Sequence, residues 1–235
     1  MADAEVHRAV THACTTLDVC RRKWRALQTP GRVALTNHVN GRLLLGHADR
    51  ASVWPKGFAG VRAGVAKRAL REQYAAEDAL APVMRDLDKV VSDMRTAADA
   101  LRTKVSMLLQ QRRPTALLSP SLSPHGGGRA ATLDAEGARQ LVARVDATVR
   151  SFETELQLRR TVVRELTGEV GGPDAPHCSA IDGDRLPPGW DASARLLLSA
   201  WVLEPHLEND KLDLFFDSMA AEQVGSPARR GSPRT

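Results

Sequence analysis

The stretch LAPVMRDLDKVVSDMRTAADALRTKVSMLL, residues 80–109, decides the fold class of this 235-residue chain. Its apolar residues recur at steps of three and four, with one extra residue before Val105, and no Gly or Pro lies between Val83 and Arg113. Heptad spacing gives a helix one narrow apolar stripe, which needs partner helices to bury it. The stripe consists of Leu80, Val83, Leu87, Val90, Met94, Ala97, Leu101, Val105 and Leu108.

Two further segments carry apolar stripes of the same kind. Apolar residues in Val6–Leu27 recur at steps of four and three without a break, and those in Val142–Leu166 do so with Arg159 in the place of one apolar residue. Aromatic residues make up only 4% of the chain, which argues against a β-sandwich or barrel. We therefore predict an all-α fold, an antiparallel helical bundle with long coiled-coil-like helices around residues 80–109.

Helix boundaries follow from the positions of proline and glycine. Pro30 and Gly31 are expected to end a first helix, because proline removes a backbone donor and glycine is a poor helix former. The short connection then favours a hairpin between the first two helices. Pro82 is expected to kink the third and longest helix. The predicted helices span residues 3–28, 32–49, 59–111, 133–166, 192–203 and 206–223.

Composition shifts divide the chain into four predicted parts. Residues 1–112 form the N-terminal helical hairpin and the long helix, and 113–131 are a flexible linker rich in Pro, Gly and Ser. Residues 132–223 hold the C-terminal helices, which are expected to pack on the first part and to include a loop at 168–190. Residues 224–235 are expected to be a disordered basic tail.

Charge and targeting signals limit the cellular setting. The chain has 33 basic and 28 acidic residues, so its formal charge of +5 is compatible with an acidic partner but does not require one. The first five residues are acidic and lack the apolar core of a secretory signal, and no apolar run is long enough to span a membrane. We expect a protein of the cytoplasm, the nucleus or both, which is not secreted and has no membrane partner.

Signatures of catalysis are few. The triple glycine at 126–128 is not followed by the Lys-Ser/Thr of a phosphate-binding loop, and the three cysteines lack C-x-x-C spacing. His177 and Cys178 are adjacent, but no further metal ligand is near them in the sequence. We therefore expect a protein that is not an enzyme, with no catalytic residues, no cofactor, no metal and no small-molecule substrate.

Five residues are the predicted partner-binding set. Arg159 interrupts an apolar stripe, either because the helix leaves its own core there to meet a partner or because the side chain snorkels to solvent. Leu214, Phe215 and Phe216 span too wide an arc of one helix to pack on a single neighbour, so this helix is either enclosed by its own bundle or anchors another protein. The set is Arg159, Arg160, Trp190, Phe215 and Phe216.

The order of short motifs resembles that of the AIRIM family, small helical ribosome maturation factors that interact with an AAA ATPase. The shared features are an apolar-face tryptophan on the first helix, a Phe-led long helix, a Leu-Ser-Pro-Ser linker, a Leu-basic-basic step, a Leu-Pro-x-x-Trp turn and an acidic helix with a Phe-Phe pair. In this chain they correspond to Trp24, Phe58, Leu118–Ser121, Leu158–Arg160, Leu186–Trp190 and Phe215–Phe216.

This resemblance implies a non-catalytic adaptor subunit of an AAA ATPase complex that acts in late maturation of the large (60S) ribosomal subunit. Its implied partners are the ATPase, the associated adaptor subunits and the pre-60S particle. Two alternatives stay open. One is a coiled-coil scaffold subunit of a tethering, cytoskeletal or kinetochore complex. The other is an RNA-binding helical protein that uses basic clusters such as the one around Trp24.

Overall fold

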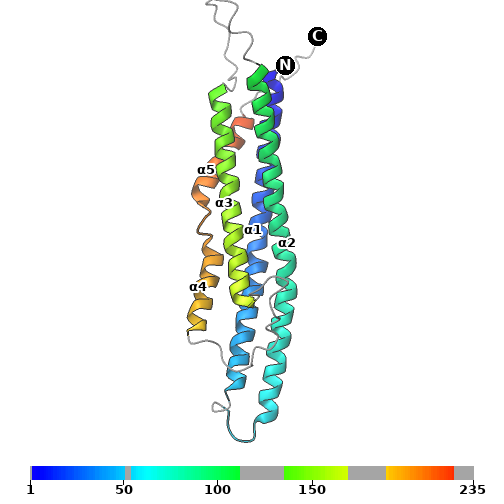
Figure 1. Ribbon diagram of the computed structural model, residues 1–235, viewed down its shortest axis with the longest axis vertical. Coiled ribbons are helices and arrows are strands. Elements are labelled where there is room, and N and C mark those ends of the chain that lie inside the picture. The colour runs from blue at the N-terminus through cyan, green and yellow to red at the C-terminus, as the bar shows by residue number, and fades with distance from the viewer. Residues whose placement is uncertain (1, 51–53, 112–134, 169–188, 225–235) are drawn as a thin grey trace, which may run out of the picture. The chain divides into compact units, whose positions relative to one another are not determined.

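A computed structural model describes residues 2–50, 54–111, 135–168 and 189–224. Every regular element in these ranges is an α-helix, so the prediction of an all-α fold is confirmed. Neither the predicted linker at 113–131 nor most of the predicted loop and tail belongs to the described residues. No described helix has the length and the apolar run that crossing a bilayer needs. The helices are α1 (Ala2–Asp49), α2 (Ala59–Gln111), α3 (Ala135–Thr167), α4 (Trp190–Leu203) and α5 (Asn209–Val224) (Figure 1).

The predicted hairpin between residues 3–28 and 32–49 is wrong, because α1 is one helix of 48 residues with Pro30 inside it. An internal proline costs about 3 kcal/mol in an exposed helix. Burial on both sides of Pro30 opposes that cost, since Trp24 is 1% exposed and Leu35 is fully buried. Tertiary packing therefore overrides the local signal to stop.

The boundaries of the other helices are close to prediction with one exception. α2 and α3 begin and end within two residues of the expected positions, and α3 closes at Gly168 with a φ of 74°. Helix α5 begins at Asn209 and not at His206. In the segment between α4 and α5, the backbone N–H of His206 donates a hydrogen bond to Glu155, on α3.

The described chain divides into two compact units, whose boundaries lie inside α1, α2 and α3 and not at the predicted linkers. Unit 1 contains the first part of α1, to Arg22, with α2 from Val91, α3 to Phe152, and α5. Unit 2 contains α1 from Lys23, α2 to Val90, α3 from Glu153, and α4 with the three residues that follow it, to His206. Three long helices therefore contribute to both units.

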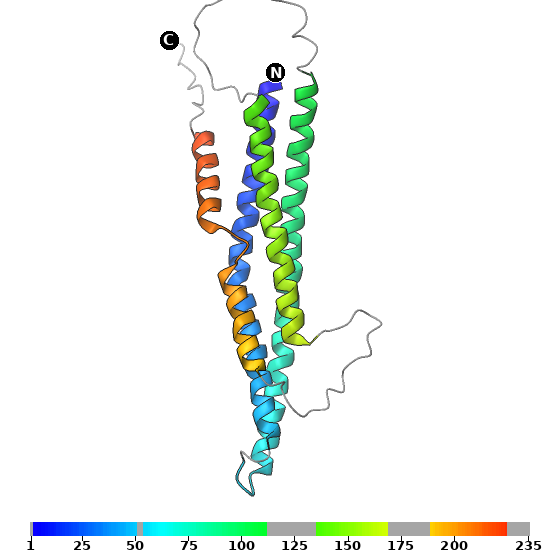
Figure 2. The same ribbon diagram turned by 60° about the vertical axis from the view of Figure 1, so that its left-hand side comes forward.

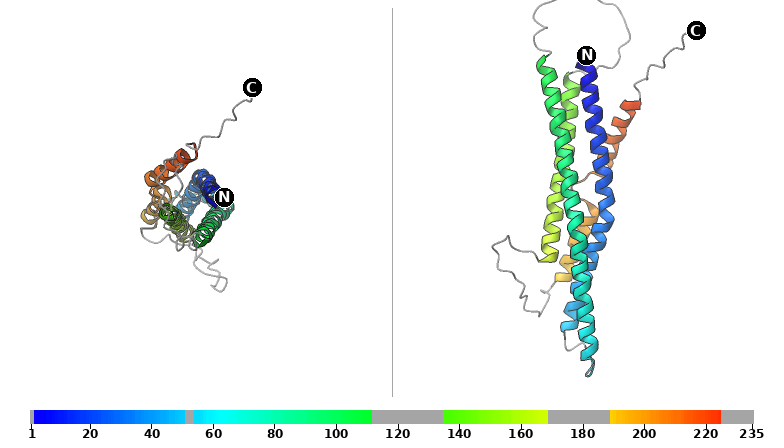
Figure 3. Two further views of the ribbon diagram at one scale, coloured as in Figure 1. Left: turned by 90° about the horizontal axis from the view of Figure 1, so that it is seen from above. Right: turned by 90° about the vertical axis from the view of Figure 1, so that its right-hand side faces the viewer.

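The core of unit 1 is apolar and includes both phenylalanines of α5. Leu17, Met94 and Val145 are fully buried, from α1, α2 and α3 respectively. Phe215 and Phe216 are 5% and 7% exposed and meet edge to face, with ring centroids 5.2 Å apart. Figure 3 shows α5 beside α1, where Arg21 pairs with Asp213 and lies over the Phe216 ring at 4.7 Å.

The core of unit 2 combines apolar residues with large tryptophans. Leu35, Leu87 and Leu166 are buried, from α1, α2 and α3, and Trp201 of α4 is 1% exposed. Figure 2 shows α4 lying along α1. There Gly31 faces Trp201 so closely that a Cβ at this position would clash with the indole ring. The glycine expected to end a helix therefore makes room for α4 instead.

Candidate functional site

Arg159 lies at the centre of a buried polar cluster in unit 2. Its side chain is 0% exposed. Its Nη2 donates hydrogen bonds to the Gln28 Oε1 at 2.7 Å, to the Glu204 Oε1 at 2.9 Å and to the Trp201 carbonyl at 3.3 Å. The guanidinium of one α3 residue therefore contacts α1, the last turn of α4 and the residue that follows it.

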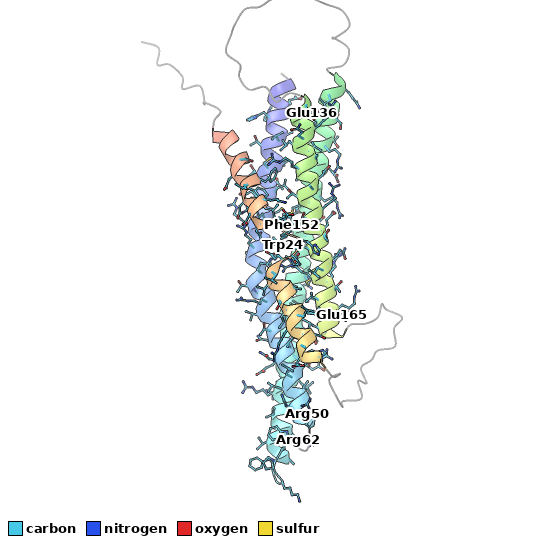
Figure 4. The ribbon with its side chains drawn as sticks, turned by 90° about the vertical axis from the view of Figure 1, so that its left-hand side faces the viewer. Trp24, Arg50, Arg62, Glu136, Phe152 and Glu165 are labelled. Carbon is cyan, nitrogen blue, oxygen red and sulfur yellow. The ribbon has the colours of Figure 1, made fainter. Side chains whose placement is uncertain are left out.

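Two indole rings flank the Arg159 guanidinium. The Cζ of Arg159 lies 4.9 Å from the centroid of Trp24, on α1, and 4.3 Å from that of Trp201, on α4. Arginine stacks well on aromatic faces and is more weakly hydrated than an ammonium group. The two rings thus stabilise a cation that burial would otherwise disfavour. Figure 4 labels Trp24 at the level where α4 ends.

Glu204 supplies the carboxylate for this cluster from an unusual backbone position. It follows α4 directly and is a non-glycine residue with a positive φ, 46°. Its Oε1 accepts hydrogen bonds from Trp24 Nε1, at 2.7 Å, from Gln28 and from Arg159. A non-glycine residue whose backbone is in the left-handed region is uncommon, and this conformation costs about 1 kcal/mol or more. The contacts of the Glu204 side chain must therefore hold the residue in this conformation.

Glu155, one turn before Arg159 on α3, is the second buried carboxylate. Its Oε1 lies 3.4 Å from the Arg159 Nε, and its Oε2 accepts the backbone N–H of His206 at 3.2 Å. Burial raises the pKa of Glu155, against the opposing effects of the His206 bond and of Arg159. Burial likewise lowers the pKa of Arg159, whereas Glu204 and Glu155 raise it. The cluster therefore ties the chain after α4 to α3.

A second polar cluster in unit 2 closes the C-terminal end of α3. The Leu166 carbonyl accepts a hydrogen bond from Arg42 Nη1 at 2.7 Å and lies 3.0 Å from His38 Nε2. Helix ends leave carbonyls unsatisfied, and cations suit the negative end of the helix dipole. Arg42 also lies over the Trp190 ring, with 5.3 Å from its Cζ to the centroid. Both ends of α4 are thus held by arginine–tryptophan contacts.

The fixed helix α4 carries apolar side chains on its outer surface. Leu196 and Leu203 are 72% and 73% exposed, and Val202 is 51% exposed. Leu196 and Leu203 are seven residues apart, so they share one face of the helix. The opposite face buries Ala194 and Trp201. The outer stripe, Leu196 and Leu203, is therefore an apolar surface on a helix whose inner face is anchored.

The structure places the five predicted partner-binding residues in different environments. Arg159 is buried, so neither the exit of its helix from the core nor snorkelling explains it, and it can influence a partner only through its neighbours. Arg160 is half exposed and pairs with Asp88 at 2.8 Å. Trp190 is half-buried over Arg42. Phe215 and Phe216 are buried in unit 1, whereas the other three belong to unit 2.

Sequence reasoning missed the residues that complete the cluster, namely Gln28, Glu155, Trp201 and Glu204. The available signal was the pair Glu155–Arg159, an acid four residues before a base in the apolar stripe of one helix. The remaining partners are 42 to 131 residues from Arg159 in the sequence and leave no local pattern. Within the described ranges, no three His, Cys, Asp or Glu side chains gather as a metal site would need.

No protein-family model, curated protein or solved structure matches this chain.

Proposed function

We propose that the chain is a non-catalytic adaptor subunit of an AAA ATPase complex that acts in late maturation of the large ribosomal subunit. The observation that carries the proposal is the anchored helix α4. Its inner face is fixed by Trp201 and the Arg159 cluster, and its outer stripe exposes Leu196 and Leu203. Exposed apolar residues on a rigid element are suited to docking on another protein.

The resemblance to the AIRIM family supports the identity of the partner. Several residues that carry the resemblance make arginine–aromatic contacts inside a unit. Trp24 contacts Arg159, Trp190 contacts Arg42, and Phe215 contacts Arg144, with 5.0 Å from the Arg144 Cζ to the Phe215 centroid. The motifs thus coincide with residues that hold α4 and α5 against the other helices.

We infer further that the helices form an antiparallel bundle with coiled-coil-like packing. The support is the burial of the heptad stripe in residues 80–109. In unit 2, Leu80, Val83, Leu87 and Val90 are at most 6% exposed, and in unit 1, Met94 and Leu101 are at most 1% exposed. A stripe covered within its own chain is not available for pairing with a second copy, which disfavours the scaffold alternative.

In the proposed mechanism the ATPase supplies the chemistry and this chain supplies a docking surface. The Arg159 cluster fixes the position of α4 before a partner arrives, which reduces the entropy lost on binding. Trp190, the first residue of α4, would border the contact. Arg160 lies in the same unit but pairs with Asp88 on α2. Arg159 acts through its neighbours and Phe215 and Phe216 through the packing of α5.

The test is affinity purification of the tagged full-length chain from its native cell, followed by mass spectrometry. We expect a AAA ATPase together with pre-60S proteins in the wild-type sample. The double substitution Leu196→Asp with Leu203→Asp should remove them, because charges replace the outer stripe. The matched control is Leu214→Asp, which changes a leucine that is 71% exposed on α5. Absence of the ATPase, or equal loss in the control, would contradict the proposal.

A further inference from the structure

Residues 50–71 form a strongly basic stretch of the chain. Residues 50–71 contain Arg50, Lys56, Arg62, Lys67, Arg68 and Arg71, and no acidic residue. The stretch therefore holds six of the 33 basic residues and none of the 28 acidic ones. Such a local excess attracts an anionic partner.

These cations lie on and around the first turns of α2, in unit 2. Figure 4 labels Arg50 and Arg62 near the connection between α1 and α2. Ala69 is fully buried, and its carbonyl lies 3.1 Å from the place of a Cβ on Gly41, so this side of α2 packs on α1. Lys67, Arg71 and Tyr74 follow the spacing i, i+4, i+7 and share one exposed face.

The exposed cations of this face are available to a ligand. Arg68 pairs with Glu72, with 2.7 Å between Nε and Oε1. Lys67 and Arg71 have no acidic partner among the residues that the structure describes. Their charges are therefore not neutralised within the described chain.

Two exposed aromatic rings belong to the same part of the chain, and one of them, Tyr74, shares the face of Lys67 and Arg71. Phe58 is 49% exposed and Tyr74 is 62% exposed, and they are the two exposed aromatic residues of the described chain. The phenylalanines and tryptophans elsewhere are buried or half-buried. Cations combined with exposed rings are the combination that single-stranded nucleic acids require, because phosphates bind the former and bases stack on the latter.

We propose that residues 67–74 form a binding surface for single-stranded RNA. Lys67 and Arg71 bind phosphates, and Tyr74, which shares their face of α2, stacks on a base. The charge and the exposure of the surface are independent of the proposed adaptor function, whereas the choice of RNA over DNA rests on it.

An anionic bilayer fits the same surface less well. Binding to a bilayer through a helix requires an apolar face that is separate from the charged face. Val61 and Leu70, which are 53% and 42% exposed, are nine residues apart and so lie on opposite sides of α2. Tyr74 shares its face with Lys67 and Arg71. Apolar and charged groups are therefore intermixed around the helix, and no face is suited to insertion.

The test measures the fluorescence anisotropy of a labelled single-stranded oligouridylate of roughly a dozen nucleotides with the full-length chain, over a series of salt concentrations. We expect binding at low salt. Substitution of Lys67→Glu with Arg71→Glu should weaken it about tenfold or more and reduce the slope of log K against log salt by about 1.4, since each phosphate contact on a single strand contributes about 0.7.

Tyr74 and a matched control separate stacking from general charge. Tyr74→Ala should weaken binding about fivefold or more without changing the salt slope, whereas Tyr74→Phe should retain it, because the ring does the stacking. The control is Arg85→Glu with Lys89→Glu, which changes two exposed cations with the same spacing on the same helix and unit. It should bind like the wild type. Circular dichroism checks that each variant keeps its helices.

Several results would overturn the proposal. They are the absence of binding to oligouridylate at low salt, an equal loss in the control, or binding of oligodeoxythymidylate as tight as that of RNA. Binding to phosphatidylcholine–phosphatidylserine vesicles without binding to RNA would replace RNA by a membrane surface. The co-purification of the ATPase depends on Leu196 and Leu203 instead, so failure of one proposal is distinguishable from failure of the other.

Discussion

Arg159 occupies a regular core position of α3, although in the sequence it looks like a break in an apolar stripe. One row of buried residues on α3 recurs at steps of three and four once polar side chains are included, and Val149 and Leu156 are buried beside it. The row is Ala138, Leu141, Val145, Thr148, Phe152, Glu155, Arg159, Val162 and Leu166. The arginine is therefore part of the core, and its charge is compensated by two carboxylates and two indoles.

Removal of the Arg159 side chain should strongly destabilise the protein. Arg159→Ala leaves Glu155 and Glu204 in the interior without their cation, and breaking a buried pair in this way costs about 3–5 kcal/mol. The adjacent Arg160 provides the control, because its pair with Asp88 is half exposed. Arg160→Ala should cost about 1 kcal/mol or less. Urea unfolding of both variants measures the difference, and equal costs would show that the buried cluster contributes no special stability.

The protein should lose stability through His38 as the pH falls. Burial lowers the pKa of His38 from 6.5, an effect that outweighs the opposing Leu166 bond and Glu77, and Arg42 adds to it. The folded state then prefers the neutral ring, so this contribution is present above pH 6.5 and is lost as the pH falls through the lowered pKa. His38→Gln should flatten the decline of the unfolding free energy between neutral and acidic pH.

The control for this pH dependence is His47→Gln, which changes an exposed histidine on the same helix and in the same unit. Its profile of unfolding free energy against pH should follow that of the wild type. A His38→Gln profile as steep as the wild-type profile would assign the acid sensitivity to groups other than His38.

At the scale of elements, the structure distinguishes glycines that serve packing from glycines that do not. Gly31 on α1 lies against the Trp201 ring, so Gly31→Ala places a Cβ where the indole sits and should cost about 1–3 kcal/mol. Gly64 on α2 has open space around it. Gly64→Ala should therefore stabilise the protein by about 0.5–1 kcal/mol, because alanine favours the helix. Thermal unfolding of both variants tests this opposite sign.

Pro30→Ala tests the continuity of α1. In an uninterrupted helix, alanine restores a backbone donor and removes a steric conflict, so the variant should be more stable, by up to about 3 kcal/mol. At the turn of a hairpin, the same change would loosen the unfolded chain and should be neutral or destabilising. Urea unfolding decides between them, with Gly64→Ala as the reference for a simple gain in helix propensity.

Local sequence signals predict an element well when no distant residue opposes them. The range of α2 and the end of α3 at Thr167–Gly168 followed from heptad spacing and from glycine at the helix terminus. The stop at Pro30–Gly31 failed because Trp201, 170 residues later in the chain, packs there and no local pattern reports it. The sequence marks the Arg159 site because a charged residue interrupts an apolar stripe. It does not predict the role of Arg159, because the residues that contact Arg159 leave no pattern in the local sequence.

At the scale of the whole molecule, the uneven distribution of charge and of exposed apolar residues suggests two separate surfaces. The stretch at 50–71 carries six basic and no acidic residues, and the outer stripe of α4 carries Leu196 and Leu203. The two features differ in chemistry, so salt should weaken association through the first and have little effect on association through the second. Salt dependence is thus a means of assigning a binding partner to one surface or the other.

The heptad stripe in residues 80–109 should not join two copies of the chain, because its own helices already cover it. A dimer held by this stripe would gain stability with protein concentration, whereas a monomer has a concentration-independent midpoint of thermal unfolding. We expect the same midpoint over a wide range of concentrations, together with a monomer mass in sedimentation equilibrium. If weak association appears, Leu196→Asp with Leu203→Asp should abolish it, since these leucines are exposed. Association that persists in that variant and raises the midpoint would instead support the scaffold alternative.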